Sequence, residues 1–345
     1  LLTPLVEQGI LPPVADRTGP EPVVLRGRDG IGKYGGSWLM NVGAQWDMRR
    51  IEDMYAASTL VRASPFGYPY VPHVAKGWTA SEDRTEYIIH LRKGLKWSDG
   101  HPYTAEDILF WWEWEATQPE VGRHSTVPEF MKTRGVPATV EKIDDYTVRV
   151  RFAYPNGLFI QQLATHDGRL LTNTPRHYLE IYHPILGDQD LIRKAIKAFN
   201  LQSPRELYGR IRDAMNAEHP RLWPWIYRTY KSNPPQTFVR NPYYFAVDEA
   251  GNQLPYIDQH IWDVKAPDFI PQAAAAGQLT CQSMFLRFED FSLYMDNREK
   301  FGYRVILRQS SSGSAYLIYP NLNRRVTPDD PSTRWKRWYL NNKRF

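Results

Sequence analysis

Hydrophobic and polar residues follow two different periods in the segment IIHLRKGLKWSDGHPYTAEDILFWW. From Ile88 to Lys93 apolar and polar side chains alternate in the way typical of a β-strand. Asp99-Gly100 then gives a strong turn signal. Thr104 is a suitable helix N-cap, Asp107 stands in the third helical position, and an apolar run follows. The pattern predicts a strand, a tight turn and a capped helix that ends near Thr117.

Other segments predict further short elements. Residues 140–152 are typical of a hairpin with its turn at Asp144-Asp145. Residues 35–42 predict a strand, which a polar loop at 43–50 follows. The remaining predicted helices span 4–9, 52–61, 158–164, 175–182, 191–199, 204–217 and 271–276, and the remaining strands span 23–25, 78–81, 237–240, 256–265, 303–307 and 315–319. This mixture of short elements indicates an α/β or α+β fold.

Length and cysteine content narrow the class of protein. A chain of 345 residues predicts two or more packing units. No apolar run approaches the ~18 residues of a membrane span. Leu1 begins no basic-then-apolar signal segment, which fits a mature or trimmed form. Cys281 is the single cysteine, so an internal disulfide is excluded, and we expect this thiol to be buried.

Charge and aromatic content point away from nucleic acid and toward a binding pocket. The net charge is +5, but basic and acidic residues are mixed along the chain, so we expect a solvated surface and no nucleic-acid partner. Aromatic residues make up 14% of the chain, with 12 Trp and 21 Tyr. Most of these rings are expected in the core, while some are available for flat contacts with a ligand.

Catalytic and cofactor motifs fit this chain poorly. The nine histidines show no metal-binding spacing, and we expect a hairpin turn rather than a calcium loop at 248–252. The Gly-rich segment 30–36 lacks the P-loop pattern, and Ser312-Gly313-Ser314 is not a nucleophile elbow. Glu113 and Glu115 lie on opposite helix faces. The sequence therefore favours binding without catalysis, metal or cofactor.

The first segment also resembles the signature hLRxGxxWSDGxPhTAxDhhxxW (h, apolar) of the family 5 solute-binding proteins of ABC importers, which include oligopeptide- and dipeptide-binding proteins. Residues 240–258, RNPYYFAVDEAGNQLPYID, resemble a segment found mainly in one subgroup of that family. Leu11-Pro12-Pro13, the stretch 32–36 and the stretch 175–179 occur in the expected order. The resemblance covers nearly the whole chain, from about residue 5 to 345.

The resemblance implies an α/β fold of the type II periplasmic-binding-protein-like kind, with two lobes. Residues 1–20 would form an N-terminal arm, 21–65 and 171–305 lobe one, and 66–170 its extra subdomain. Residues 306–345 would form the hinge and the start of lobe two. Family members run on for some 200 residues more, so we expect a chain that is truncated at its C-terminal end.

The resemblance also implies a function. The expected role is a periplasmic or extracellular, cell-envelope-associated monomer that captures an oligopeptide between its lobes and delivers it to ABC transporter permease subunits. Contact with the membrane would run only through the permease or an anchor absent from this sequence. An oligosaccharide is the alternative ligand, since the tryptophan content suits sugars. A secreted hydrolase is the rival from another class, and a sensory or chaperone-like module is a third.

Candidate ligand contacts follow from the same resemblance. The ligand-facing loop would be Gln45, Trp46, Asp47 and Met48, whose backbone we expect to pair with an extended peptide as an added strand. In the hinge, Ser312 and Tyr316 would donate hydrogen bonds. Each has a structural alternative: Trp46 as a packed surface aromatic, Asp47 as a helix N-cap, and the hinge pair as ordinary strand packing. Trp97, Asp99, Gly100, Thr104 and Asp107 are expected to be scaffold.

Overall fold

The computed structural model describes residues 2–27, 29–52, 58–118, 121, 127–228 and 235–307. Its contacts divide the chain into a unit Leu1–Gly302 and a second unit Tyr303–Phe345, of which only residues 303–307 are described. The strand predicted over 303–307 is wrong, because a strand needs a hydrogen-bonded neighbour and no described strand pairs with these residues. The strand predicted over 315–319 lies outside the described residues.

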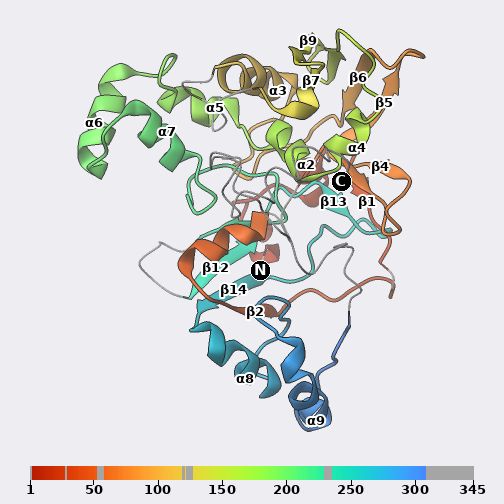
Figure 1. Ribbon diagram of the computed structural model, residues 1–345, viewed down its shortest axis with the longest axis vertical. Helices are drawn as coiled ribbons and strands as arrows, with labels where there is room; N and C mark the ends of the chain where they lie inside the picture. The colour runs from red at the N-terminus through yellow and green to blue at the C-terminus, as the bar shows by residue number, and fades with distance from the viewer. Residues whose placement is uncertain are drawn as a thin grey trace, which may run out of the picture. The chain divides into compact units, whose positions relative to one another are not determined.

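A mixed four-stranded sheet, in the order β11-β12-β14-β2, carries the elements most relevant to binding (Figure 1). Its strands are β11 (Trp225–Tyr227), β12 (Gln236–Arg240), β14 (Gln259–Val264) and β2 (Ser37–Val42). β14 and β2 run parallel, with Val264 opposite Val42, whereas the other pairs are antiparallel. The parallel pair joins segments more than 200 residues apart, a pairing no local pattern could predict.

A second four-stranded sheet, in the order β5-β6-β10-β9, is antiparallel throughout. Its strands are β5 (Ala75–Ala80), β6 (Glu86–Leu91), β10 (Thr147–Arg151) and β9 (Thr139–Asp144). The alternating pattern predicted the β9–β10 hairpin, and in β6 and β10 every second residue is buried. Three two-stranded pairs complete the sheets: β1 (Val23–Val24) with β13 (Ala246–Val247), β3 (Val61–Ala63) with β4 (Tyr70–Pro72), and β7 (Lys132–Thr133) with β8 (Val136–Pro137).

The capped helix after the signature turn forms as predicted. Helix α3 (Ala105–Trp111) begins after Thr104, whose Oγ1 accepts the Glu106 N–H at 3.3 Å. The Asp107 carboxylate accepts the Thr104 N–H at 2.9 Å, which completes a capping box. The last turn, η3 (Trp112–Ala116), is a π-helix, a widening that the sequence pattern did not predict.

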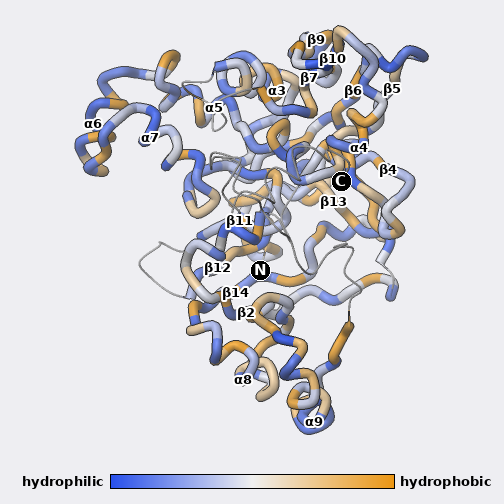
Figure 2. The backbone as a smooth tube through the Cα atoms, in the orientation of Figure 1, coloured by the Kyte–Doolittle hydropathy of each residue, from blue (hydrophilic) through white to orange (hydrophobic). Residues whose placement is uncertain are grey.

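The other described helices are short. They are α1 (Thr3–Glu7), α2 (Val14–Thr18), η1 (Gln45–Arg49), η4 (Glu129–Met131), α4 (Phe159–Leu163), η5 (His166–Thr172), α5 (Arg176–Leu179), η6 (Glu180–Tyr182), α6 (Gln189–Phe199), α7 (Pro204–Ile211), η7 (Pro267–Phe269), α8 (Ile270–Ala275), η8 (Phe288–Asp290) and α9 (Phe291–Phe301). Helix α6 is amphipathic, and Figure 2 shows both hydrophobic and hydrophilic residues along it. The prediction missed α2, α9 and β11.

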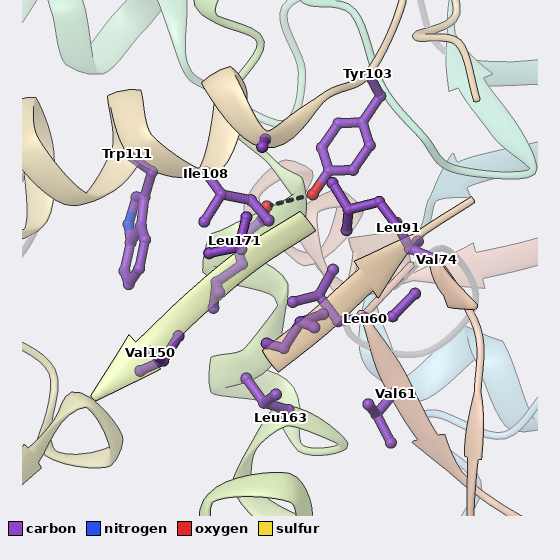
Figure 3. Close-up of a cluster of buried hydrophobic side chains, with 14 of the residues drawn as sticks. Leu60, Val61, Val74, Leu91, Tyr103, Ile108, Trp111, Val150, Leu163 and Leu171 are labelled. Carbon is purple, nitrogen blue, oxygen red and sulfur yellow. Dashed lines mark hydrogen bonds between the residues drawn. The ribbon is translucent and has the colours of Figure 1, made fainter. Parts of the chain in front are cut away.

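In the described part of the chain, buried side chains form three clusters. The largest lies between the antiparallel sheet and α3 and includes Leu91, Ile108 and Val150 (Figure 3). Within it the Tyr103 hydroxyl donates to the Leu171 carbonyl at 2.9 Å, so the one polar group of this ring is satisfied. A second cluster lies on the mixed sheet around Trp262. The third joins α5, α6 and α7.

Three predictions need correction. The polar loop expected at 43–50 contains the 3₁₀ helix η1, because a side chain closes the turn locally, as described below. The helix expected over 52–61 is wrong at its end, where Val61 begins β3; residues 53–57 lie outside the described part. Cys281 is exposed rather than buried, because it lies in an irregular segment at the rim of the mixed sheet. Among the described residues, no helix is long and apolar enough to cross a membrane.

Candidate functional site

The two parallel strands of the mixed sheet end side by side. Val42 of β2 pairs with Val264 of β14, and the Lys265 N–H donates to the Val42 carbonyl at 2.9 Å. In open α/β sheets ligands bind outside the carboxyl ends of such strands. The segment that follows β2 is the one in which the sequence placed the lobe-one ligand contacts, so it lies at the expected end of the sheet.

A third segment runs along β2 and ends at the same place. The Thr280 N–H donates to the Leu39 carbonyl at 3.1 Å. Two residues further on, the Gln282 side-chain amide accepts the Asn41 N–H at 3.0 Å and donates to the Asn41 carbonyl at 2.9 Å. Both chains advance two residues between these contacts, so 280–284 runs parallel to β2. We call residues 43–50, 265–269 and 284–285 the carboxyl edge.

Asp47 holds the first turn of the carboxyl edge together. Its Oδ2 accepts the Ala44 N–H at 2.9 Å, and the Asp47 N–H donates to the Ala44 carbonyl at 3.1 Å. The Oδ1 atom accepts a hydrogen bond from Arg50 Nε at 3.0 Å. Asp47 is only 1% exposed, and its two carboxylate oxygens and its N–H are each hydrogen-bonded within the turn. These contacts are those of a side chain that closes a helical turn, while a direct ligand contact stays a prediction.

Trp46 is the solvent-facing member of the turn. Its side chain is 63% exposed, although Trp usually buries most of its surface. The Arg50 guanidinium carbon lies 5.4 Å from the ring centroid, a cation–π distance. Since Arg50 also binds Asp47, one residue orients both the turn and the ring. The exposed indole offers a flat apolar surface to an aromatic ring or a sugar face.

The other predicted site residues are placed less completely. Gln45 and Met48 belong to η1, but the structure does not describe their side chains. Ser312 and Tyr316 lie outside the described residues. The expected strand addition does not fit residues 45–48, because a 3₁₀ turn presents no extended edge to a partner strand.

Two aromatic residues of the carboxyl edge were missed by the sequence. Phe269 in η7 is 63% exposed, and Phe285 follows the segment that borders β2. The ring of Phe285 lies over Gly43, where an added Cβ would stand 2.8 Å from the ring Cζ. Only the parallel pairing of segments distant in sequence brings them to the end of β2, so no local motif could have identified them.

Other clusters in the described residues carry no comparable chemistry. A pocket of about 610 Å³ lies beside the antiparallel sheet, where the Glu21 carboxylate binds Lys76 Nζ at 2.5 Å and the Lys93 N–H at 3.0 Å. His101 and His177 stack at 3.9 Å, and His177 binds Asp99. The described part of the chain contains no group of three side chains suited to a metal ion. The signature residues Asp99 and Thr104 therefore act in the scaffold.

The 240–258 segment, which the sequence singled out, also forms a structural turn. The Asp248 carboxylate accepts the N–H groups of Ala250 and Asn252, the Asn252 side-chain amide and the Tyr256 hydroxyl, at 2.6–2.9 Å. Since these donors saturate both oxygens, the turn is a hydrogen-bonded loop and not a calcium loop.

Comparisons with known proteins agree with the fold. A family model for bacterial extracellular solute-binding proteins, family 5 Middle, matches residues 69–345. The periplasmic alpha-galactoside-binding protein of Rhizobium meliloti is 31% identical over 279 residues, which cover 74% of this chain and 37% of that protein. The dipeptide-binding protein of Escherichia coli is 30% identical over 113 residues, 30% of this chain and 21% of that protein.

Solved structures add the three-dimensional likeness. An oligopeptide-binding protein OppA matches with a TM-score of 0.81 and 34% identity, over 88% of this chain and 48% of its own. The periplasmic binding protein MelB of Agrobacterium fabrum, in complex with stachyose, matches with a TM-score of 0.65 and 26% identity, over 85% and 44%. The expected α/β, type II periplasmic-binding-protein-like fold is confirmed. This chain spans at most about half the length of these relatives, and it belongs to family 5 of the bacterial extracellular solute-binding proteins.

Proposed function

We propose that this chain is part of a periplasmic or extracellular protein that captures an oligopeptide and delivers it to the permease of an ABC importer. The observation that carries the proposal is the exposed Trp46 on a turn held by Asp47, at the carboxyl ends of parallel strands. A binding residue needs a fixed position before the ligand arrives, since ordering it afterwards reduces affinity. The family, which consists of solute-binding proteins, supports binding rather than catalysis.

The oligopeptide class is supported by the relatives. The structure with a TM-score of 0.81 is described as an oligopeptide-binding protein, and the dipeptide-binding protein of Escherichia coli matches a shorter stretch. The described turn would contribute a side-chain contact to such a ligand, while backbone pairing would have to come from elsewhere in the protein.

An oligosaccharide is the second candidate, and specific observations favour it. The relative named for α-galactosides aligns over 74% of this chain, and MelB was solved with stachyose. An exposed indole such as Trp46 suits the flat face of a sugar ring. Phe269, also exposed at the carboxyl edge, adds a second ring of the same kind.

We propose the lobe boundaries on the same basis. Residues 21–65 and 171–305 contribute all four strands of the mixed sheet, which supports their assignment to lobe one. Residues 66–170 contribute all four strands of the antiparallel sheet, which supports an extra subdomain. The N-terminal arm 1–20 is anchored by Arg17, which binds the Pro242 carbonyl and the Gln253 side chain, both at 2.6 Å. The hinge at 306–345, with Ser312 and Tyr316 as donors, completes the proposal.

Native mass spectrometry of the complete protein, purified without refolding, tests the function. The expected spectrum shows the protein with a co-purified solute, released on activation with the mass of a short peptide or a small oligosaccharide. Incubation with tri-alanine and with stachyose follows, each in excess. Binding of one probe without conversion supports capture and identifies the class. Hydrolysis of a bound probe would contradict the proposal and favour the secreted hydrolase.

A further inference from the structure

Phe285 has an unusual backbone. Its φ is 60°, in the left-handed region that bulky residues rarely adopt. Such a strained conformation persists only where the surroundings impose it. The residues before Phe285 show the constraint, because Gln282 is bound to both backbone groups of Asn41 and donates to the Met284 carbonyl at 2.7 Å.

The ring of Phe285 fills the space in which Gly43 has no side chain. A Cβ added to Gly43 would lie 2.8 Å from Phe285 Cζ, 2.9 Å from its Cε1 and 3.2 Å from Pro267 Cγ. Contacts under 3.0 Å would force the ring to move. Gly43, Phe285 and Pro267 therefore pack together, and they come from the three segments that end at the carboxyl edge.

Gly43 directly precedes the turn that carries Trp46. Ala44 is the residue whose N–H and carbonyl bind Asp47, so any movement at Gly43 is transmitted to this pair. A glycine before a ligand-facing turn would by itself leave the backbone free to move. The Phe285 ring and Pro267, which both pack on Gly43, remove that freedom.

We infer that Phe285 is a positioning residue for the ligand site: its ring clamps Gly43 and so fixes the turn that presents Trp46. The inference rests on the proposed function, since it assigns Phe285 to the same ligand site. The ligand class that benefits is one with flat apolar faces, sugar rings or aromatic peptide side chains, because stacking requires an indole of fixed orientation. The left-handed backbone of Phe285 is explained as the conformation that aims its ring at Gly43.

Phe285→Gly in the complete protein tests the clamp, because glycine keeps the left-handed backbone and removes only the ring. Hydrogen exchange followed by mass spectrometry, without ligand, should show amides of residues 43–50 exchanging about tenfold faster. Phe285→Met, whose unbranched apolar side chain can still reach Gly43, should exchange at a rate between those of Phe285→Gly and the wild type. Phe288→Ala is the matched control, because Phe288 is 80% exposed and its ring stacks on Phe291. Unchanged exchange at 43–50 in Phe285→Gly, or a uniform increase across the molecule, would overturn the inference.

A double-mutant cycle adds a second readout. Gly43→Ala alone should also accelerate exchange at 43–50, since its Cβ collides with the ring. In Gly43→Ala/Phe285→Gly the collision is gone, so the two effects should not add; simple additivity would contradict the clamp.

Titration with stachyose and with tri-tyrosine, a peptide with aromatic side chains, separates the two proposals. If either probe binds, Phe285→Gly should weaken its Kd about tenfold and Phe285→Met should weaken it less. If neither probe binds the wild-type protein, the proposed ligand classes fail, while the exchange data still decide whether Phe285 fixes the turn. A wild-type Kd in Phe285→Gly would contradict the positioning role.

Discussion

At the scale of single residues, Asp107 shows how burial and capping act on one carboxyl. It caps α3 and also accepts the Arg176 N–H at 2.9 Å, which joins α3 to α5. Burial raises the pKa of Asp107 to about 6, although these N–H groups favour the charged form. The folded state thus retains a proton that the unfolded chain has lost.

The sign of the resulting pH dependence follows from that raised pKa. The contribution of Asp107 to stability is complete below about pH 4 and decreases by about 3 kcal/mol as the pH rises through 6. Asp107→Asn cannot titrate, so its stability relative to the wild type should rise by about 3 kcal/mol between pH 4 and pH 7 in urea titrations. Equal pH slopes in the two proteins would show that Asp107 is not protonated in the fold.

His73 has the opposite pH dependence. It is buried, its Nδ1 lies 3.1 Å from the Thr59 carbonyl, and burial lowers its pKa to about 3. Between about pH 6.5 and pH 3 the His73 imidazole is protonated in the unfolded chain but neutral in the folded protein. The free energy of unfolding therefore decreases as the pH falls from 6.5 toward 3. His73→Asn keeps a donor near Thr59 and should be less stable at pH 7 by about 1–3 kcal/mol. It should also lose about 2 kcal/mol less than the wild type between pH 7 and pH 4.5 in urea titrations; a steeper loss would refute the assignment.

At the scale of elements, two glycines with contrasting surroundings make a matched pair. Gly209 lies in α7, is exposed, and has open space where a Cβ would stand. Gly209→Ala should stabilise the protein by about 0.5–1 kcal/mol, because alanine is the better helix former. Gly168 in η5 is buried, and a Cβ there would collide with the Leu163 carbonyl. Gly168→Ala should destabilise by more than about 1 kcal/mol, and denaturant midpoints that rank the two variants the other way would contradict this packing.

The elements also show what could be predicted from the sequence. Helix α3 and the β9–β10 hairpin were predicted because their signals, a capping box and an Asp-Asp turn between alternating strands, are local. The parallel pairing of β2 with β14 and the Gln282 contact with Asn41 depend on segments more than 200 residues apart. Of the candidate site, the family resemblance named Trp46 and Asp47, whose contact with a ligand stays a prediction, whereas Phe285 can be recognised only from the tertiary structure.

At the scale of the whole molecule, the two four-stranded sheets have different roles. The antiparallel sheet and α3 enclose the largest core. The most recognisable sequence motif lies there, and its residues Thr104 and Asp107 make the hydrogen bonds of the α3 cap. The mixed sheet brings three carboxyl ends together and exposes Trp46 and Phe269 there. The strongest family signature thus lies in the scaffold, while the proposed binding surface has only a weak sequence signal.

Isothermal titration of the complete protein and of its Trp46→Ala variant, each with stachyose and with tri-tyrosine, tests the central claim most directly. We expect the wild type to bind one of the two probes and Trp46→Ala to bind it at least about tenfold more weakly, since an exposed stacking ring is lost. Phe66→Ala is the control, because Phe66 is 93% exposed and lies outside the carboxyl edge. Equal affinities of wild type and Trp46→Ala would contradict a ligand site at the carboxyl edge.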